Sequence, residues 1–342
     1  MQYELKTQVI EPTRHTFDHI AARYGDRPAT RYQEGTIGLQ PKENFHYRPS
    51  YAPEREMYDV NYSAYKLADP EGFVDPRGYY YTPYVTNRSE MHEGFGASLE
   101  YVTKRELFGR TPDAWKTVMT EVLIPTRHYE SGAQMLFSGA CRFCYGSALA
   151  QCCAYESFDR VGNAQLISRI GIALGDQTAT VLREGKRAWM EAEHMQPLRK
   201  LIEELLIEED WADSVTGIDY ADRLLSALLH KHLEEVAINN GAGAYSLLIQ
   251  HLDGWYAEHR KWLDALYKAW TSDETHGASN IELFSASANK WLPQAEAAVR
   301  DIAARADELL GADAGCVAAV EAAALETREA LSKLGLTVEE AR

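Results

Sequence analysis

A long helical stretch, from Ala114 to about Arg199, places the strongest constraint on the fold of this chain. Its apolar residues recur at helical spacing, whereas no run of alternating apolar residues in the chain makes a convincing strand. Because proline removes a backbone donor, a break or kink is expected near Pro125. The predicted helices of this stretch are Ala114–Ala154, Gly162–Leu174 and Thr178–Met195.

The chain beyond residue 84 also has helical periodicity on both sides of this stretch, so the predicted fold class is all-α. The further helices are expected at Asn87–Phe108, Asp210–Asn240, Ala244–Trp270, Asn280–Leu310 and Asp313–Leu334. We therefore expect three parts. They are an extended arm over residues 1–84, a helical bundle over residues 85–292, and peripheral C-terminal helices over residues 293–342.

The first 84 residues hold eight of the 12 prolines and twelve of the 20 tyrosines. Proline at this density prevents long helices, and the aromatic content disfavours disorder. One short helix is expected, at Thr13–Tyr24. The arm either folds back on its own bundle or contacts another subunit, and we favour the second because tyrosine and arginine are enriched in interfaces. The predicted interface residues are Phe45, His46, Tyr47, Arg48, Arg77, Tyr79, Tyr80, Tyr81 and Tyr84.

A metal-holding helical bundle needs a particular ligand pattern. One helix supplies a Glu and the next supplies Glu-x-x-His, and the set occurs twice. We place Ser168 and Gly171 at the two ligand positions of the Gly162–Leu174 helix, and neither residue binds metal. Glu121 and Glu130 lie nine residues apart, about 180° around a helix, so they cannot share one metal ion. The sequence therefore predicts a bundle without a metal site.

Glu191 and His194 have full Glu-x-x-His spacing on a predicted helix, and they support an alternative, a metal-binding enzyme that acts alone. Charged neighbours favour a solvent-exposed helix face instead. Two further segments come close to the pattern, one ending in His259 with tyrosine in place of Glu, the other ending in His276 with Asp273 in place of Glu. No complete second copy occurs at a matching distance.

Cys141 and Cys144 form a Cys-x-x-Cys pair, which occurs in zinc half-sites and in redox pairs. Here the pair lies in an apolar helix without the loop of a zinc site. With Cys152 it falls on roughly one helix face, and a buried cysteine behaves as a small hydrophobic residue. We therefore expect these cysteines to pack in the core.

The net charge of −16 argues against a nucleic-acid partner, which requires a basic surface. We find no apolar run of about 18 residues that would predict a membrane span. The N-terminus lacks the apolar core of a secretory signal. Five cysteines, an odd number, fit the reducing cytoplasm better than a disulfide framework.

Several segments resemble the β (small oxygenase) subunit of bacterial multicomponent phenol hydroxylases. The likeness extends to about Trp291 and is strongest in the arm. The segments that carry it are Val9–Phe17, Pro28–Glu34, Asn44–Pro49, Asp75–Arg77, Arg160–Gln165 and Ser168–Gly171.

This resemblance implies a ferritin-like bundle that serves as a non-catalytic structural subunit, with no catalytic residue and no cofactor of its own. It implies a catalytic α subunit that holds the di-iron centre and a small γ subunit, in an (αβγ)2 assembly. A regulatory protein and a reductase with FAD and a 2Fe-2S cluster complete the system. That system hydroxylates phenol or related aromatics with O2 and electrons from NADH. The alternative within the resemblance is the β subunit of a toluene or alkene monooxygenase.

Overall fold

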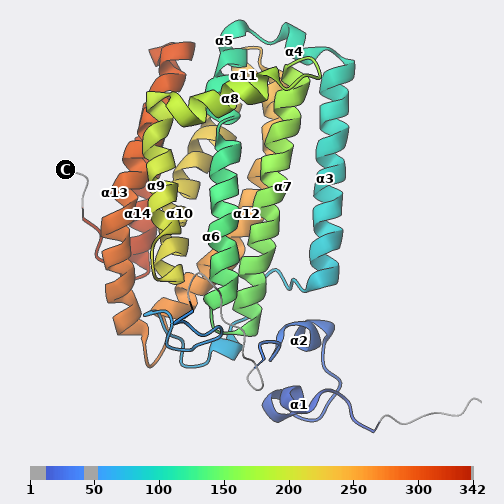
Figure 1. Ribbon diagram of the computed structural model, residues 1–342, viewed down its shortest axis with the longest axis vertical. Coiled ribbons are helices and arrows are strands. Elements are labelled where there is room, and N and C mark those ends of the chain that lie inside the picture. Colours follow the sequence, from blue (N-terminus) through green and yellow to red (C-terminus); the bar gives the residue numbers. More distant parts are fainter. Residues whose placement is uncertain (1–12, 42–52, 340–342) are drawn as a thin grey trace, which may run out of the picture.

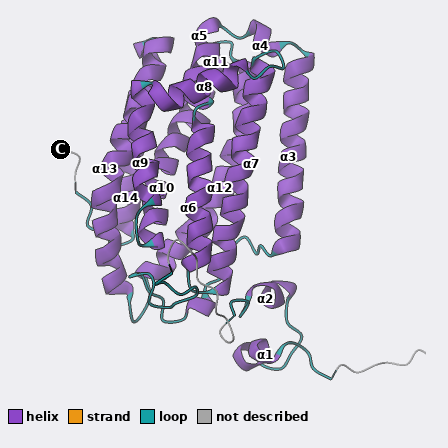
Figure 2. Cartoon of the chain, in the orientation of Figure 1, coloured by secondary structure: helices purple, strands orange, loops and turns teal. Residues whose placement is uncertain are grey.

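The computed structural model describes residues 13–41 and 53–339, and in that part of the chain every regular element is a helix (Figures 1 and 2). The predicted all-α bundle with an N-terminal arm is therefore confirmed. No helix among the described residues is both long enough and apolar enough to cross a membrane.

Most helices run along the main axis of the molecule, and the others lie at its two ends (Figure 1). The helices along the axis are α3 (Tyr81–Lys104), α6 (Thr126–Phe143), α7 (Ser147–Leu174), α9 (Gln196–Leu206), α10 (Trp211–Leu225), α12 (Gly243–Thr271), α13 (Gly277–Leu310) and α14 (Cys316–Lys333). The helices at the ends are α1 (Asp18–Tyr24), α2 (Arg31–Thr36), α4 (Leu107–Arg110), α5 (Asp113–Val118), α8 (Thr180–Glu191) and α11 (Leu233–Asn239).

One hydrophobic core joins the helices from α3 to α14, because their apolar faces meet at the centre of the bundle. Its largest fully buried rings include Trp115, Trp262 and Trp270. α14 adds Cys316 and Val320 to the same core. α13 is continuous through residue 292, where the sequence predicted that the peripheral part of the chain begins.

Two breaks divide the predicted Ala114–Ala154 helix. The expected irregularity near Pro125 is confirmed, since α5 passes into a π-helix at Met119–Leu123 and α6 starts after the proline. The second break was not predicted: α6 ends at Phe143 and α7 begins at Ser147. Gly146 between them has φ of 115°, and a Cβ there would lie 2.8 Å from the Pro70 carbonyl oxygen. Gly146 therefore permits a tight connection between two helices where the sequence predicted one continuous helix.

A second π-helix, Ser226–His232, joins α10 to α11. The predicted helix Asp210–Asn240 is thus one irregular run, and the predicted Gly162–Leu174 helix is the second half of the longer α7.

The part of the arm that precedes α3 lies against one end of the bundle, below α6 and α13 in Figure 1. Tyr65 and Phe73 enter the main core from this segment. Its backbone amides donate to side chains at the helix ends, as Leu39 does to Ser147 (2.8 Å), Ala64 to Asp210 (2.7 Å), Lys66 to Asn280 (3.0 Å) and Ala68 to Asp273 (2.8 Å). Ser147 and Asn280 are buried, so the arm satisfies buried polar groups at these two helix ends.

Candidate functional site

A cluster of charged side chains lies at the axis of the bundle, where four helices meet. α6 contributes Glu130, α7 contributes Glu156 and Arg160, α10 contributes Asp222, and α12 contributes His259. The side chains of Glu156, Arg160 and His259 have no exposed area. Because charges buried at this depth must be paired, the contacts within the cluster determine what it can do.

The guanidinium of Arg160 is the centre of the cluster. Its Nε donates to Glu156 Oε1 at 2.8 Å, and its Nη1 donates to Asp222 Oδ1 at 2.9 Å. Nη2 donates to the second oxygen of Asp222, so this pair is bidentate. Nη1 also lies 3.4 Å from Glu130 Oε2. One cation thus binds carboxylates from three helices.

His259 closes the fourth side of the cluster. Its Nδ1 lies 2.8 Å from Glu156 Oε2, and its Nε2 lies 3.7 Å from Asp222 Oδ2. Neither contact has the geometry of a hydrogen bond, and the Nε2 contact is also too long for one. Tyr129 adds a conventional bond, donating from its hydroxyl to Asp222 Oδ1 at 2.8 Å.

Burial and charge shift the pKa values of the two glutamates in opposite directions. Burial raises the pKa of Glu130 to about 7, against the attraction of Arg160. Burial also acts to raise the pKa of Glu156, but His259 and Arg160 outweigh it and hold that pKa below its ordinary value. Of the two glutamates, Glu130 is therefore the one that takes up a proton first as the pH falls.

The cluster follows the spacing of a metal-holding bundle with three changed residues. The first is Asp222 of α10, an aspartate where the bundle pattern has a glutamate. α7 carries Glu156 and Asp159, which is Glu-x-x-His with aspartate in place of histidine. α12 carries Tyr256 and His259, which is the same pattern with tyrosine in place of glutamate. Asp159 bonds elsewhere, to both Nε and Nη2 of Arg88 at 2.7 Å.

The prediction that Ser168 and Gly171 occupy the ligand positions is wrong. Ser168 donates to the carbonyl of Ala164 and lines a surface groove, three turns of α7 away from Glu156. A Cβ on Gly171 would lie 2.6 Å from the side chain of Leu182, so this glycine allows α8 to approach. The axis of the bundle therefore carries charged side chains, where the sequence predicted a serine and a glycine.

The remaining candidate ligands lie apart from the axis. Glu191 is the last residue of α8, His194 lies in the following 3-10 turn, and His194 Nε2 is 3.0 Å from the Glu121 carbonyl oxygen. The expected surface position of this pair is confirmed. Glu121 itself pairs with Arg305, which confirms that it does not share a site with Glu130.

The positions of the cysteines fit a role in core packing. All five are free thiols, and Cys144 and Cys152 are buried in the main core, as predicted. The predicted common helix face is wrong, because Cys141 lies on α6, Cys144 follows its last residue, and Cys152 lies on α7. Cys141 is half-buried, and burial raises the pKa of its thiol to about 12. Since the thiolate is the reactive form, Cys141 is unreactive at neutral pH.

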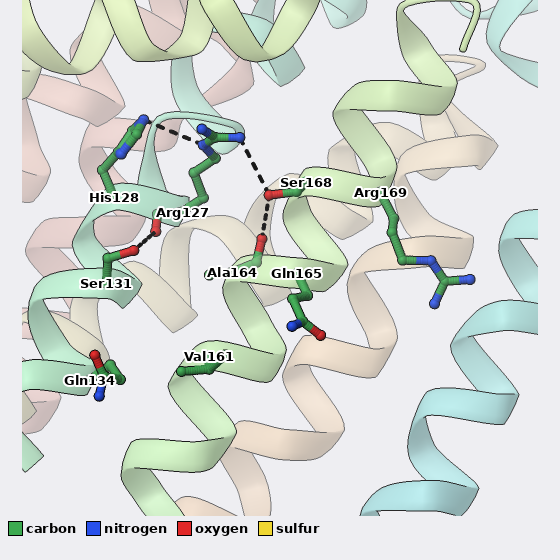
Figure 3. A pocket seen from close by; sticks show the side chains of 9 residues that line it. All are labelled: Arg127, His128, Ser131, Gln134, Val161, Ala164, Gln165, Ser168 and Arg169. Atoms are coloured by element: carbon green, nitrogen blue, oxygen red, sulfur yellow. Dashed lines mark hydrogen bonds between the residues drawn. The ribbon is translucent and has the colours of Figure 1, made fainter. Parts of the chain in front are cut away.

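A groove of about 560 Å³ runs between α6 and α7 on the outside of the bundle (Figure 3). Its lining residues are Arg127, His128, Ser131 and Gln134 from α6, and Val161, Ala164, Gln165, Ser168 and Arg169 from α7. Burial and the adjacent Arg127 lower the pKa of His128 to about 4, so its imidazole is neutral at neutral pH. Met135 and Phe158 on the same two helices are more than half exposed.

The predicted interface residues fall into three groups. Phe45, His46, Tyr47 and Arg48 lie outside the described residues. Arg77, Tyr79 and Tyr84 are buried within the chain; Arg77 bonds Asp75 and Tyr84 donates to Asp159. Tyr80 is half-buried, and Tyr81, the first residue of α3, is 72% exposed. Contact of these residues with another subunit stays a prediction.

Comparison with known proteins shows the family. Residues 48–274 match the model of the Methane/Phenol/Alkene Hydroxylase family. The chain belongs to this family. An oxygenase component of phenol 2-monooxygenase from Pseudomonas sp. (strain CF600) is 31% identical over 92% of this chain and 94% of its own length. The corresponding component from Acinetobacter pittii (strain PHEA-2) is 32% identical over 88% of this chain and 89% of its own.

Solved structures agree with this membership. A chain of the xenon-pressurised phenol hydroxylase from Pseudomonas sp. OX1 superimposes with a TM-score of 0.88 at 32% identity, covering 99% of this chain and all of that one. A chain of toluene 4-monooxygenase gives a TM-score of 0.75 at 19% identity, over 87% of this chain and 99% of its own, which shows a shared fold. The resemblance predicted from the sequence is confirmed, and the chain is a phenol hydroxylase-family component.

The family is one of di-iron monooxygenases, but the residues at this axis do not fit a metal ion. The carboxylate oxygens that a metal ion would require are already bound by the Arg160 guanidinium. The space beside Glu130 and Asp222 is about 20 Å³, close to the size of a single water molecule. Within residues 13–41 and 53–339, no group of three or more His, Cys, Asp and Glu side chains is arranged to hold a metal ion.

We expect Glu130→Gln to stabilise the protein at high pH. The folded pKa of Glu130, about 7, lies above its ordinary value of 4.5. The folded state therefore binds this proton more tightly than the unfolded state, and stability is lost as the pH rises from about 4.5 through 7. The variant should be more stable than the parent by about 1–3 kcal/mol at pH 8, with little difference at pH 4.5.

Urea unfolding across this pH range measures the effect. Glu121→Gln is the matched control, because Glu121 is partly exposed and pairs with Arg305 at the surface. Its difference from the parent should stay within about 0.5 kcal/mol at each pH. A Glu130→Gln variant that is less stable than the parent at pH 8 would contradict the assignment.

Proposed function

We propose that the chain is the non-catalytic structural β subunit of the hydroxylase component of a multicomponent phenol hydroxylase. The observation that carries this proposal is the filled axis of the bundle. A site for a small aromatic substrate takes about 300 Å³ or more, whereas the space beside Glu130 and Asp222 is about 20 Å³. Family membership and the phenol 2-monooxygenase relatives support the same assignment.

In this proposal the chemistry takes place on another chain. A catalytic α subunit holds the di-iron centre, a small γ subunit completes an (αβγ)2 assembly, and a regulatory protein assists. A separate reductase carries FAD and a 2Fe-2S cluster and transfers electrons from NADH. The assembly hydroxylates phenol or a related aromatic with O2, in the cytoplasm. The role of this chain is to hold the helices of the α subunit in place, so that their metal ligands stay at the positions that the metal site requires.

The face formed by α6 and α7 is our proposed contact for the α subunit. Met135, Phe158 and Val161 are 54%, 58% and 43% exposed. Val161 lines the groove of Figure 3, and Met135 and Phe158 lie one turn from the groove residues Ser131 and Val161 on the same two helices. Exposed apolar side chains gathered on one face are typical of a protein interaction site. Tyr81 and the arm residues Phe45, His46, Tyr47 and Arg48 belong to the same proposal, together with Tyr80.

Co-expression with the neighbouring oxygenase genes tests the proposal. Tagged α subunit should retain this chain through gel filtration, and phenol should be hydroxylated only when both chains and the reductase are present. The chain purified alone should contain substoichiometric iron. Near-stoichiometric iron bound by its own side chains, or turnover without an α subunit, would contradict the proposal.

Phe158→Glu tests the proposed face directly. A buried, unpaired carboxylate at an interface core costs several kcal/mol, so retention by tagged α subunit should fall at least about tenfold. Leu325→Glu is the matched control, because Leu325 is 59% exposed on α14, outside this face. Unchanged circular dichroism for both variants shows that they are folded. Equal retention of the two variants would rule out this face.

A further inference from the structure

The groove between α6 and α7 has a chemical character that contact with an α subunit does not by itself explain. We infer that this groove binds a carboxylate side chain of the α subunit, with the Arg127 guanidinium as the group that receives it. The inference rests on the proposed function, because it names the chemistry of a partner on the same face of the molecule.

The charge of the groove is opposite to that of the chain. The chain has 51 acidic and 35 basic side chains, for a net charge of −16. The described side chains that line the groove include two arginines, Arg127 and Arg169, but no aspartate or glutamate. Lys186 of α8 adds to the positive charge, since it acts together with Arg127 to lower the pKa of His128. A cationic site on an acidic protein favours an anionic partner.

Arg127 is half-buried, and no carboxylate among the described residues pairs with it. Its Nε donates to His128 Nε2 at 3.3 Å and its Nη1 donates to Ser168 Oγ at 3.4 Å (Figure 3). Both contacts are long, and both partners are neutral. A guanidinium has five N–H donors, so most of the donor capacity of Arg127 is not used by these two contacts.

Other arginines that are withdrawn from solvent have a carboxylate partner within the chain. Arg88 binds Asp159 on the inner side of α3, and Arg305 binds Glu121 at 2.7 Å on the outer side of α13. Arg127 has paid the cost of partial burial without this compensation, because burial lowers its pKa. A carboxylate from another chain would accept two parallel bonds from the guanidinium and so provide the missing partner.

The exposed apolar side chains of the same face lie beyond the other end of the groove. α6 and α7 are antiparallel, so Met135 and Phe158 lie at one end and Arg127 and Ser168 lie at the other. Arg127 and Met135 are eight positions apart on α6, or about 12 Å along its axis. An α-subunit helix with an apolar residue and a glutamate or aspartate about two turns apart would match both ends.

Competition for the α subunit tests the inference. The parent chain and one variant are co-expressed with tagged α subunit and γ subunit, and the complex is purified. Mass spectrometry then compares the ratio of variant to parent in the complex with their ratio in the lysate. Arg127→Glu should enter the complex at least about tenfold less well than the parent, because its carboxylate would face another carboxylate. Arg127→Gln, which only removes the charge, should show a smaller loss in the same direction.

Arg110→Glu is the matched control. Arg110 is an exposed arginine at the end of α4, outside the groove, and its reversal changes the net charge by the same amount. Its incorporation should stay within about twofold of the parent. Circular dichroism shows whether each variant is folded, and Arg127→Gln decides if Arg127→Glu is not.

The possible outcomes separate the inference from the proposed function. If the α subunit retains the parent chain but incorporates the Arg127 variants as well as Arg110→Glu, the inference is overturned and the proposed function stands. If the α subunit does not retain the parent chain, the proposed function fails, and the inference fails with it.

Arg127→Lys identifies the occupant of the groove. A carbodiimide joins an amine to a carboxylate that touches it, whereas a guanidinium does not react. In the purified complex of this variant, position 127 should be joined to an aspartate or glutamate of the α subunit, and the parent complex should lack this product. A product with a second copy of this chain or with the γ subunit would overturn the inference, and so would the absence of any product at position 127.

Discussion

Arg160→Met is expected to lower the free energy of unfolding by about 3–5 kcal/mol. Methionine fills much of the volume of the arginine stem but provides no positive charge. Glu130, Glu156 and Asp222 would then remain buried with only His259 to compensate them. Leaving a buried charge without its partner costs far more than losing an exposed ion pair.

Arg199→Met provides the control, because Arg199 pairs with Glu203 on the exposed face of α9. Urea unfolding at pH 7 should show a loss within about 0.5 kcal/mol for this variant. Combining Arg160→Met with Asp222→Asn should recover part of the stability, since one unpaired charge is then removed. A loss below about 1 kcal/mol for Arg160→Met alone would show that the carboxylates are neutralised in some other way.

Asn280→Ala should lower the free energy of unfolding by about 2–3 kcal/mol. Asn280 is fully buried; its Oδ1 accepts from the Lys66 amide at 3.0 Å, and its Nδ2 donates to the carbonyls of Lys66 and Trp270 at 2.7 and 2.9 Å. Alanine leaves these backbone groups without their partner. The segment before α3 should also become more accessible to protease.

Asn289→Ala is the matched control on the same helix. Asn289 bonds the Thr337 carbonyl and the Glu339 amide in the same way, but in a half-buried position near the C-terminus. Its loss should stay below about 1 kcal/mol in urea unfolding. Equal losses for the two variants would mean that the arm contributes no more to stability than an exposed segment does.

Helical periodicity was sufficient to predict the fold class and most helices, because an apolar stripe at helical spacing is a local property of the sequence. The break before Ser147 could not be predicted from the spacing of apolar residues. It depends on Gly146 meeting the backbone of Pro70, and residues far apart in the chain leave no periodic signal. Both π-helices are likewise invisible to an argument from regular spacing.

The charged axis could have been found with a looser pattern. Glu156 with Asp159, and Tyr256 with His259, each keep the i, i+3 spacing and change one residue. Demanding the complete Glu-x-x-His pattern led instead to Glu191 and His194. Placing the ligand positions on the predicted Gly162–Leu174 helix led to Ser168, which lines the groove. What no pattern could supply is the position of Arg160, since an arginine one turn from a glutamate usually forms an ordinary exposed ion pair on a helix surface.

The bonds between the early segment and α13 have a consequence for biosynthesis. Lys66 and Asn280 are separated by 214 positions, so the docking partner of the early segment is made last. At about 5–20 residues per second, a nascent chain waits on the order of 10–40 s before that partner emerges. During that interval Tyr65 and Phe73 have no complete core to enter. The growing polypeptide thus passes through a stage with exposed apolar side chains. Binding by a chaperone or by another subunit during that stage would protect it from aggregation.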